Sequence, residues 1–141
     1  MVATPRERKY IVKIEVLARR MAIVESGNNP DAMGDDGRAR GRWQLHPPWF
    51  AQWYQPELGD TWDQADARAL YRYLVDRHHR SASVFEALAL FHLGHAPRSH
   101  SDYVSAVGYA TGYGFSTGEL DSPVECGSVQ FEDFYGYVSA A

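Results

Sequence analysis

The sequence predicts a mainly helical α+β domain in which a small loop or β-hairpin region follows the first long helix. Two observations carry this prediction. Apolar residues recur at steps of three and four in several segments, and these segments begin with capping residues and end near glycine. A stretch rich in Gly, Asn and Asp at 27–42 then interrupts the helical pattern. The length of 141 residues suits one domain spanning 1–141.

The first helix is expected over about 5–26. Its start is the Thr-Pro-Arg-Glu run at 4–7, which combines a cap, a proline suited to the first helical position and a capping box. Gly27 is a natural stop. The apolar stripe predicted along this helix consists of Tyr10, Ile14, Leu17, Met21 and Val24. Glu25 follows Met21 by four residues, so the last side chain on or beside that stripe is an acid.

The later elements follow from similar signals. A Trp- and Pro-rich segment after the loop is expected to hold a short helix near 48–54. A capping box at 61–64 begins a helix over 62–78, and Gly94 stops another that starts at Val84. A short helix is expected over 103–109. The extension 110–141 is expected to be coil with one short strand or helix.

Composition excludes several classes of function. The net charge of −4 provides no basic field for nucleic acid. A lone cysteine, Cys126, cannot form an internal disulfide, and no apolar run is long enough to span a membrane. The N-terminal segment lacks a signal core with a cleavage site. We therefore expect a monomer made in the cytoplasm without a signal peptide.

Glu25 is the first candidate for chemistry. An acid at the end of an apolar stripe is partly removed from water, and this favours its protonated form. A protonated carboxyl near neutral pH can act as a general acid toward a glycosidic oxygen. The alternative is an ordinary acid at a helix end that faces water, because perturbed acids only sometimes mark sites.

Four motifs in order resemble the catalytic domains of lytic transglycosylases and goose-type lysozymes. The first is Glu-Ser-Gly-x-Asn-Pro-x-Ala at 25–32, and the second is Gly-x-x-Gln-Leu at 41–45. Leu-Ala-Leu-Phe-His-Leu-Gly at 88–94 is similar to the Ala-x-x-Tyr-Asn-x-Gly step of the family. Tyr-Val-x-x-Val at 103–107 is similar to its final step. The resemblance covers about 8–108 and implies a lysozyme-like fold that cleaves peptidoglycan.

The resemblance also implies residue roles. Glu25 matches the single catalytic acid, and Ser26 matches the neighbour that helps to place the acid and the sugar. Gln44 matches the glutamine that lines the groove, and Tyr103 matches the tyrosine whose hydroxyl approaches the catalytic glutamate. Two further positions lie on the family's substrate side. Phe91 and His92 replace a Tyr-Asn pair, which alters the expected substrate preference. Arg42 and Trp43 replace Leu-Met, which alters the expected groove floor.

Asp35 decides between two reactions within this family. The Gly-Asp-x-Gly loop at 34–37 is similar to that of goose-type lysozymes, in which the aspartate helps to orient the attacking water. Many lytic transglycosylases lack this acid, and the 6-hydroxyl of the substrate attacks instead to form a 1,6-anhydro sugar. A second carboxylate that leaves room for water favours hydrolysis with inversion. Asp35 can equally be a turn residue in an acidic loop, so both reactions stay open.

Aromatic residues and histidines are further candidates for ligand binding. Sugar rings stack on exposed aromatic faces, although core packing is the commoner use of tryptophan. We expect Trp43 near the groove and Trp62 in the core. The six histidines, at 46, 78, 79, 92, 95 and 100, form no zinc-type spacing, so we expect no metal and no cofactor.

These inferences lead to a peptidoglycan glycosidase that cleaves the β-1,4 bond between N-acetylmuramic acid and N-acetylglucosamine. The compact chain without a signal core suggests a bacteriolytic phage enzyme, either an endolysin released by a holin or a virion component. One alternative is an inactive lysozyme-like domain that binds glycan or serves as a virion part. Another is a related hydrolase that acts on a different polymer such as chitin.

Overall fold

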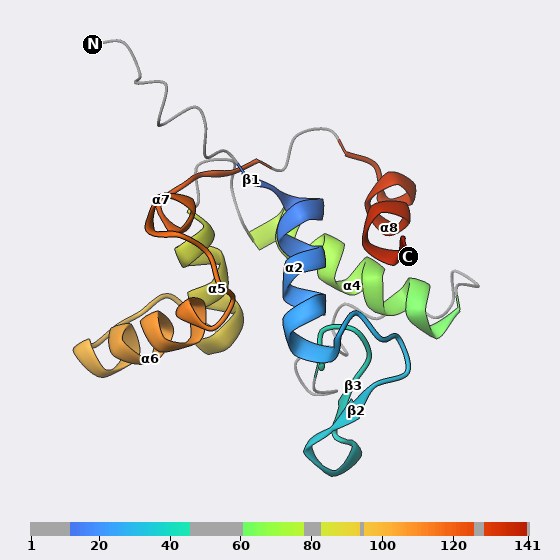
Figure 1. Cartoon of the computed structure of the whole chain (residues 1–141), viewed down its shortest axis with the longest axis horizontal. Helices are drawn as coiled ribbons and strands as arrows, with labels where there is room; N and C mark the ends of the chain where they lie inside the picture. Colours follow the sequence, from blue (N-terminus) through green and yellow to red (C-terminus); the bar gives the residue numbers. More distant parts are fainter. Residues whose placement is uncertain (1–11, 46–60, 78–82, 94, 126–128, 141) are drawn as a thin grey trace. The chain divides into compact units, whose positions relative to one another are not determined.

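The computed structural model describes residues 12–45, 61–77, 83–93, 95–125 and 129–140 (Figure 1). Within them the chain is mainly helical with small two-stranded sheets, which confirms the predicted class of α+β, mainly α. Contacts group the chain into two compact units, Met1–Ile14 with His78–Gly127, and Glu15–Arg77 with Ser128–Ala141. The prediction of one domain stays a prediction. None of the helices in the described ranges is long and apolar enough to cross a membrane.

The first long helix is shorter than the sequence predicts. Helix α2 spans Ile14–Ser26, and strand β1 occupies Val12–Lys13. Strand β1 pairs in parallel with β4, Val124–Glu125, in the register Val12 to Val124. The prediction of helix at 12–13 is therefore wrong, because pairing with a distant strand buries two valines and outweighs local helix propensity. The predicted cap at 4–7 lies outside the described residues.

The buried face of α2 ends beside Glu25. The residues of α2 that are buried in the unit of 15–77 and 128–141 are Leu17, Ala18, Met21 and Ala22. Val24, which the sequence placed on this stripe, is 49% exposed, so that part of the prediction is wrong. The true stripe passes through alanines that a search for large apolar residues overlooks. Glu25 continues it at steps of three and four and is half-buried.

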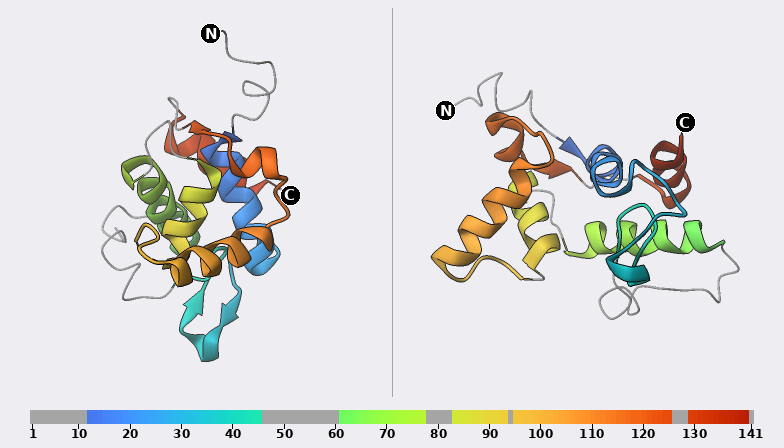
Figure 2. Two further views of the ribbon diagram at one scale, coloured as in Figure 1. Left: turned by 90° about the vertical axis from the view of Figure 1, so that its left-hand side faces the viewer. Right: turned by 60° about the horizontal axis from the view of Figure 1, so that its bottom comes forward.

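The predicted β-hairpin follows α2. Strands β2, Met33–Gly34, and β3, Ala39–Arg40, pair antiparallel in the registers Met33 to Arg40 and Gly34 to Ala39. The turn between them holds the 3-10 segment η1, Asp35–Gly37. Figure 2 shows this hairpin extending from the loop that leaves the end of α2. The sequence prediction of a hairpin in this loop is confirmed.

Helices α4 and α8 pack together in the same unit as the hairpin. Helix α4 spans Trp62–Arg77, close to the predicted 62–78, and α8 spans Phe131–Ser139. Tyr71 meets Phe134 edge to face at 5.1 Å between ring centroids, and the Arg68 guanidinium lies 4.1 Å from the Phe131 centroid. Because both β4 and α8 form within 110–141, the expectation of coil with one short strand or helix is wrong there. The helix expected near 48–54 lies outside the described residues.

The other unit contains α5, Val84–Leu93, and α6, His100–Thr111, which pack against each other. Helix α5 matches the prediction, whereas α6 is longer than the predicted 103–109. Its early start follows from Ser99, whose hydroxyl accepts a hydrogen bond from the Asp102 amide at 3.1 Å. The short helix α7, Thr117–Leu120, precedes β4. Cys126 lies outside the described residues.

Candidate active site

Glu25 lies in the last turn of α2, where the chain leaves the helix through a tight left-handed turn. The Gly27 amide donates to the Ile23 carbonyl at 2.9 Å, and the Asn28 amide donates to the Ala22 carbonyl at 3.0 Å. Gly27 and Asn28 both have positive φ, 67° and 60°. The bond from Gly27 is that of an αL C-cap, which favours glycine at this position. The turn ends the helix at Ser26, one residue beyond the acid.

Ser26 ties the helix end to the second motif. Its Oγ lies 2.7 Å from the Arg42 carbonyl oxygen and 3.1 Å from the Ala22 carbonyl oxygen. It also accepts a hydrogen bond from the Asn29 amide at 3.0 Å. A hydroxyl has one proton to donate, so the two carbonyls share it. Ser26 therefore joins the Glu-Ser-Gly step to the Gly-x-x-Gln step through backbone atoms.

Gln44 holds the base of the hairpin. Its Nε2 donates to the Gly41 carbonyl at 2.8 Å and to the Ala32 carbonyl at 3.2 Å. Gly34 lies so close to Gln44 Oε1 that a Cβ at this position would clash with it. Gln44 itself has a positive φ of 52°. Its amide nitrogen is thus used inside the protein, where it fixes the loop that the resemblance assigns to the groove.

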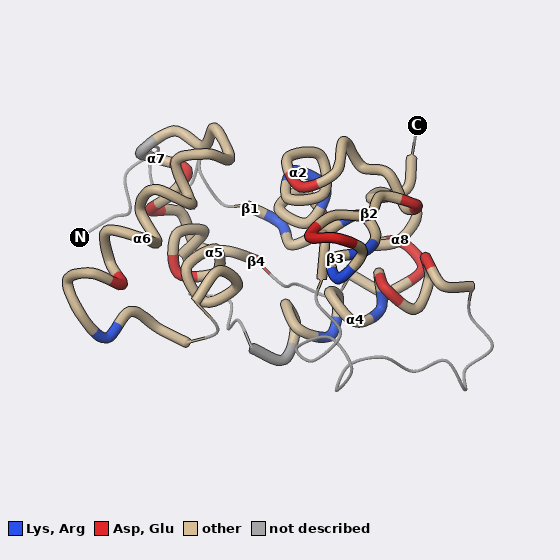
Figure 3. The backbone as a smooth tube through the Cα atoms, turned by 90° about the horizontal axis from the view of Figure 1, so that it is seen from below, with Lys and Arg blue, Asp and Glu red and all other residues tan. Residues whose placement is uncertain are grey.

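Asp35 lies in the exposed turn of the hairpin. Asp35 and Asp36 have φ of 48° and 58°, and Gly37 follows with 87°. Three consecutive left-handed residues, two of them not glycine, are uncommon, although aspartate tolerates this region better than most residues. The Asp35 carbonyl accepts hydrogen bonds from the Arg38 amide at 3.2 Å and from its Nε at 3.1 Å. Figure 3 shows the acidic segment between β2 and β3.

Trp43 is buried and Trp62 is exposed, the reverse of what the sequence predicts. Trp43 is 1% exposed, and its indole N–H donates to the Ala18 carbonyl of α2 at 2.8 Å. It is a core residue, so its prediction as a sugar-stacking surface is wrong. Trp62 is 42% exposed at the start of α4, so its prediction as a core residue is also wrong. Tryptophan is amphipathic, and spacing alone does not say which ring finds a buried partner.

Arg42 is the centre of a buried polar network that the sequence reasoning missed. It is 6% exposed, and its Nε and Nη2 donate to the two Asp63 carboxylate oxygens at 2.8 and 2.9 Å. Its Nη1 donates to the Asn28 carbonyl at 3.0 Å and to Asn28 Oδ1 at 2.7 Å. Burial opposes the charge, but the hydrogen bond and charge of Asp63 outweigh it and raise the pKa of Arg42. The only sequence signal was an arginine where the family has leucine.

Asp66 lies one turn along α4 from this pair and is 1% exposed. Burial, followed by the nearby Asp63 charge, raises its pKa to about 7, while Arg42 acts in the opposite direction. Its carboxylate lies against Gly41, where an added Cβ would come within 2.5 Å of Oδ2. Gly41 also has a φ of 83°. Glycine is required there both by the backbone conformation and by the close approach of Asp66.

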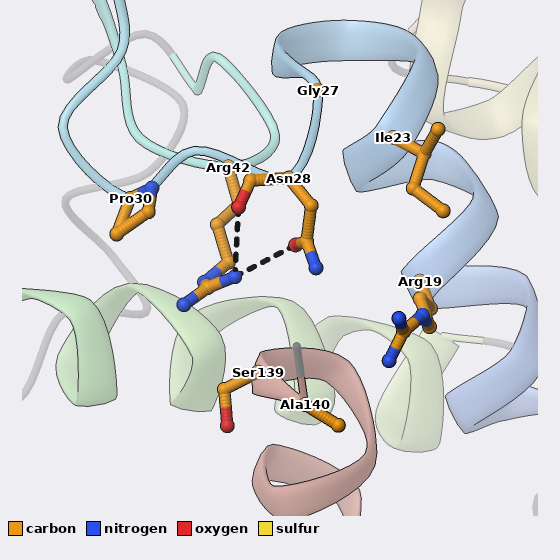
Figure 4. A pocket seen from close by; sticks show the side chains of 8 residues that line it. All are labelled: Arg19, Ile23, Gly27, Asn28, Pro30, Arg42, Ser139 and Ala140. Carbon is orange, nitrogen blue, oxygen red and sulfur yellow. Dashed lines mark hydrogen bonds between the residues drawn. The ribbon is translucent and has the colours of Figure 1, made fainter.

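A pocket of about 440 Å³ lies beside this network (Figure 4). It is lined by Arg19, Ile23, Gly27, Asn28, Pro30, Arg42, Ser139 and Ala140. Arg19 and Ile23 are the α2 residues in this lining. By rotation about the helix axis, both lie roughly on the opposite side of α2 from Glu25. The pocket therefore belongs to a different face of α2 from the proposed acid.

Three further predicted residues lie in the other unit. His92 is exposed, its Nε2 lies 2.9 Å from Ser105 Oγ, and its ring stacks on Tyr109 with 4.3 Å between centroids. Phe91 is half-buried. Tyr103 is 53% exposed and its ring lies 5.7 Å from that of Phe85. The roles of Phe91, His92 and Tyr103 in substrate binding stay predictions.

Within the unit of 15–77 and 128–141, the chain brings Ser26 and Gln44 to the loop that follows Glu25 and places Asp35 at the hairpin tip. Among the described residues, no three His, Cys, Asp or Glu side chains gather as a metal site would require. His46, His78 and His79 lie outside those residues. Comparisons with models of protein families, with characterised proteins and with solved structures find no match to this chain.

Proposed function

We propose that this chain is a lysozyme-like glycosidase that cleaves the β-1,4 bond between N-acetylmuramic acid and N-acetylglucosamine in peptidoglycan. The observation that carries the proposal is the 2.7 Å contact between Ser26 Oγ and the Arg42 carbonyl oxygen. It joins two sequence motifs, the one that begins at Glu25 and the one at 41–45, into one local structure. A half-buried acid beside a fixed polar loop suits a proton donor for a sugar polymer.

Glu25 is assigned the role of general acid. Its proton passes to the glycosidic oxygen as the C1–O bond breaks and positive charge develops on the sugar ring. A nucleophile then forms the new bond to C1 and gives up its proton, to the Asp35 carboxylate when water attacks or to the Glu25 carboxylate when the muramic 6-hydroxyl attacks. Water, oriented by Asp35, leaves a reducing end, whereas the muramic 6-hydroxyl leaves a 1,6-anhydro ring. The reaction needs no cofactor.

The test is mass spectrometry of purified peptidoglycan digested by the wild type, by Glu25→Gln and by Glu15→Gln. Glu15 is a matched control because it is an acid on the same helix, in its first turn. We expect muropeptides from the wild type and Glu15→Gln, and a loss of at least about a hundredfold with Glu25→Gln. Equal product from Glu25→Gln and wild type would contradict the proposal. A soluble chitin oligomer digested in parallel separates the peptidoglycan enzyme from a chitin hydrolase.

A second candidate is an inactive lysozyme-like domain that binds glycan or serves as a virion part. The observation that favours it is that the Gln44 amide nitrogen donates to the Gly41 and Ala32 carbonyls of the protein itself. A sedimentation assay with insoluble peptidoglycan tests it. Wild type and Glu25→Gln that both pellet with the polymer and yield no product would favour the binding domain.

For the active enzyme we propose a phage lytic role, with access to the wall through a holin or as part of the virion. This proposal rests on the resemblance alone. Expression of the native chain with and without a holin tests the first route. Lysis that depends on the holin supports it, whereas efficient export through the general secretory route would contradict it.

A further inference from the structure

The loop that follows Glu25 is bonded to helix α8, which comes from the other end of the chain. Asn28 Nδ2 donates to the Val138 carbonyl at 2.8 Å, and Arg19 Nη1 donates to the Tyr137 carbonyl at 2.8 Å. The last carbonyls of a helix have no partner within it. Side chains from α2 and its loop therefore complete the C-terminal end of α8, and a cation is favourable at that end.

Tyr135 makes the second link between α8 and this region. Its hydroxyl donates to Asp63 Oδ2 at 2.7 Å, on the same carboxylate that binds the Arg42 guanidinium. Burial and the bond to Asp63 raise the pKa of Tyr135 to about 12, so the phenol keeps its proton and stays a donor. Arg42 in turn holds both oxygens of Asn28, as Figure 4 shows. The bonds thus run from α8 through Asp63 and Arg42 to Asn28, and directly from Asn28 back to α8.

The same hydrogen-bond network reaches Ser26, the residue after Glu25. The Arg42 carbonyl contacts Ser26 Oγ while the Arg42 side chain is fixed by Asp63 and Asn28. Because Arg42 is buried, its guanidinium depends on these partners, and loosening one of them leaves a buried charge with weaker compensation. Movement of Arg42 would move its carbonyl, to which Ser26 is bonded.

We propose that α8 acts as a clasp that holds the loop after Glu25 in place, with Tyr135, Asp63, Arg42 and Asn28 as its positioning residues. Its consequence for catalysis rests on the proposed function, in which Glu25 is the general acid. None of the four residues needs to contact the sugar. Their effect is exerted through the position of Ser26 and the end of α2.

The test compares Tyr135→Phe with Tyr137→Phe. Tyr135→Phe removes the hydroxyl bound to Asp63 and keeps a ring that can stack on Phe131, whose centroid is 5.9 Å away. Tyr137 is 43% exposed on the same helix, and its link to Arg19 uses its backbone carbonyl and ring face, which phenylalanine preserves. Each variant therefore removes one tyrosine hydroxyl oxygen. The Tyr135 hydroxyl belongs to the clasp, and the Tyr137 hydroxyl does not.

The first readout is amide hydrogen exchange of the segments 26–32 and 41–45 in the full-length protein. We expect about three- to tenfold faster exchange in Tyr135→Phe, the effect of one lost hydrogen bond, and no change in Tyr137→Phe. As a second variant, Asn28→Gly accepts the positive φ and removes both side-chain links, so a larger increase is expected. Unchanged exchange in Tyr135→Phe and Asn28→Gly would overturn the clasp.

The second readout is the initial rate on soluble peptidoglycan fragments. We expect kcat to fall about three- to tenfold in Tyr135→Phe, with KM within about twofold of wild type, because the contacts to the sugar are untouched. Faster exchange with unchanged kcat, when Glu25→Gln is inactive, would overturn the link to catalysis. If the wild type yields no product that depends on Glu25, the proposed function is contradicted. The hydrogen-exchange result would then be the test of the clasp.

Discussion

At the scale of single residues, the buried Asp66 is expected to make the free energy of unfolding depend on pH. Its carboxyl group is buried on the inner face of α4, against Gly41 and near the charged groups of Asp63 and Arg42. Its pKa is raised from an ordinary 3.8 to about 7, so the folded protein binds this proton more tightly than the unfolded chain. This tighter proton binding adds to the free energy of unfolding. The added stability is complete below pH 3.8 and is lost as the pH rises through about 7.

Asp66→Asn is therefore expected to flatten the fall in unfolding free energy between pH 4 and pH 7. Each pKa unit corresponds to about 1.4 kcal/mol, so the wild type should lose on the order of 4 kcal/mol over this range through Asp66. Urea denaturation of both proteins at several pH values measures the difference. Asp31→Asn, in an exposed turn, is the control and should follow the wild type. Parallel curves for wild type and Asp66→Asn would contradict the prediction.

The sequence predicted single residues well where periodicity determined their position. It placed Glu25 at the end of the buried stripe of α2, and the structure confirms that position. It could not predict Arg42 or Asp66 as buried, because burial of a charge depends on partners such as Asp63 that are distant in the sequence. It reversed Trp43 and Trp62 for the same reason, since the partner of the Trp43 indole is a backbone carbonyl of another element.

At the scale of elements, local signals were sufficient where caps and stop residues were present. The capping box of α4 is formed as predicted, with the Thr61 amide donating to Gln64 Oε1 at 2.9 Å and the Gln64 amide to Thr61 Oγ1 at 3.2 Å. Helix α8 was missed because its cap residue, Gln130, makes no capping bond from its side chain. Its other end is completed by Asn28 and Arg19, which no local pattern reveals.

Thr61→Ala tests the contribution of this cap. The change removes the hydroxyl that accepts from the Gln64 amide and is expected to lower the unfolding free energy by about 1 kcal/mol. Thermal denaturation followed by circular dichroism measures it. Thr61→Ser keeps the hydroxyl and should restore most of the loss. A destabilisation of equal size in both variants would show that the methyl group, and not the cap, accounts for the effect.

At the scale of the whole molecule, the predicted functional residues fall into two groups. Glu25, Ser26, Asp35 and Gln44 belong to the unit of Glu15–Arg77 and Ser128–Ala141, and the tyrosine predicted to approach the acid, Tyr103, belongs to the other. The motifs follow one another along the chain, so their order could be predicted from the sequence. The network of α8 could not, because it joins residues as far apart as Asn28 and Val138.

In the proposed enzyme, Asp35 distinguishes the two possible reactions. Its left-handed backbone, shared with Asp36 and Gly37, is also that of an ordinary hairpin turn, so the case for a catalytic role rests on the resemblance to goose-type lysozymes. We therefore expect reducing-end muropeptides from the wild type and a rate about a hundredfold lower in Asp35→Asn, the usual loss for a general base. Asp36→Asn changes the next acid in the same exposed turn and should keep nearly full activity. Anhydro-muropeptides from the wild type, with Asp35→Asn as active as Asp36→Asn, would mean that the muramic 6-hydroxyl attacks in place of water.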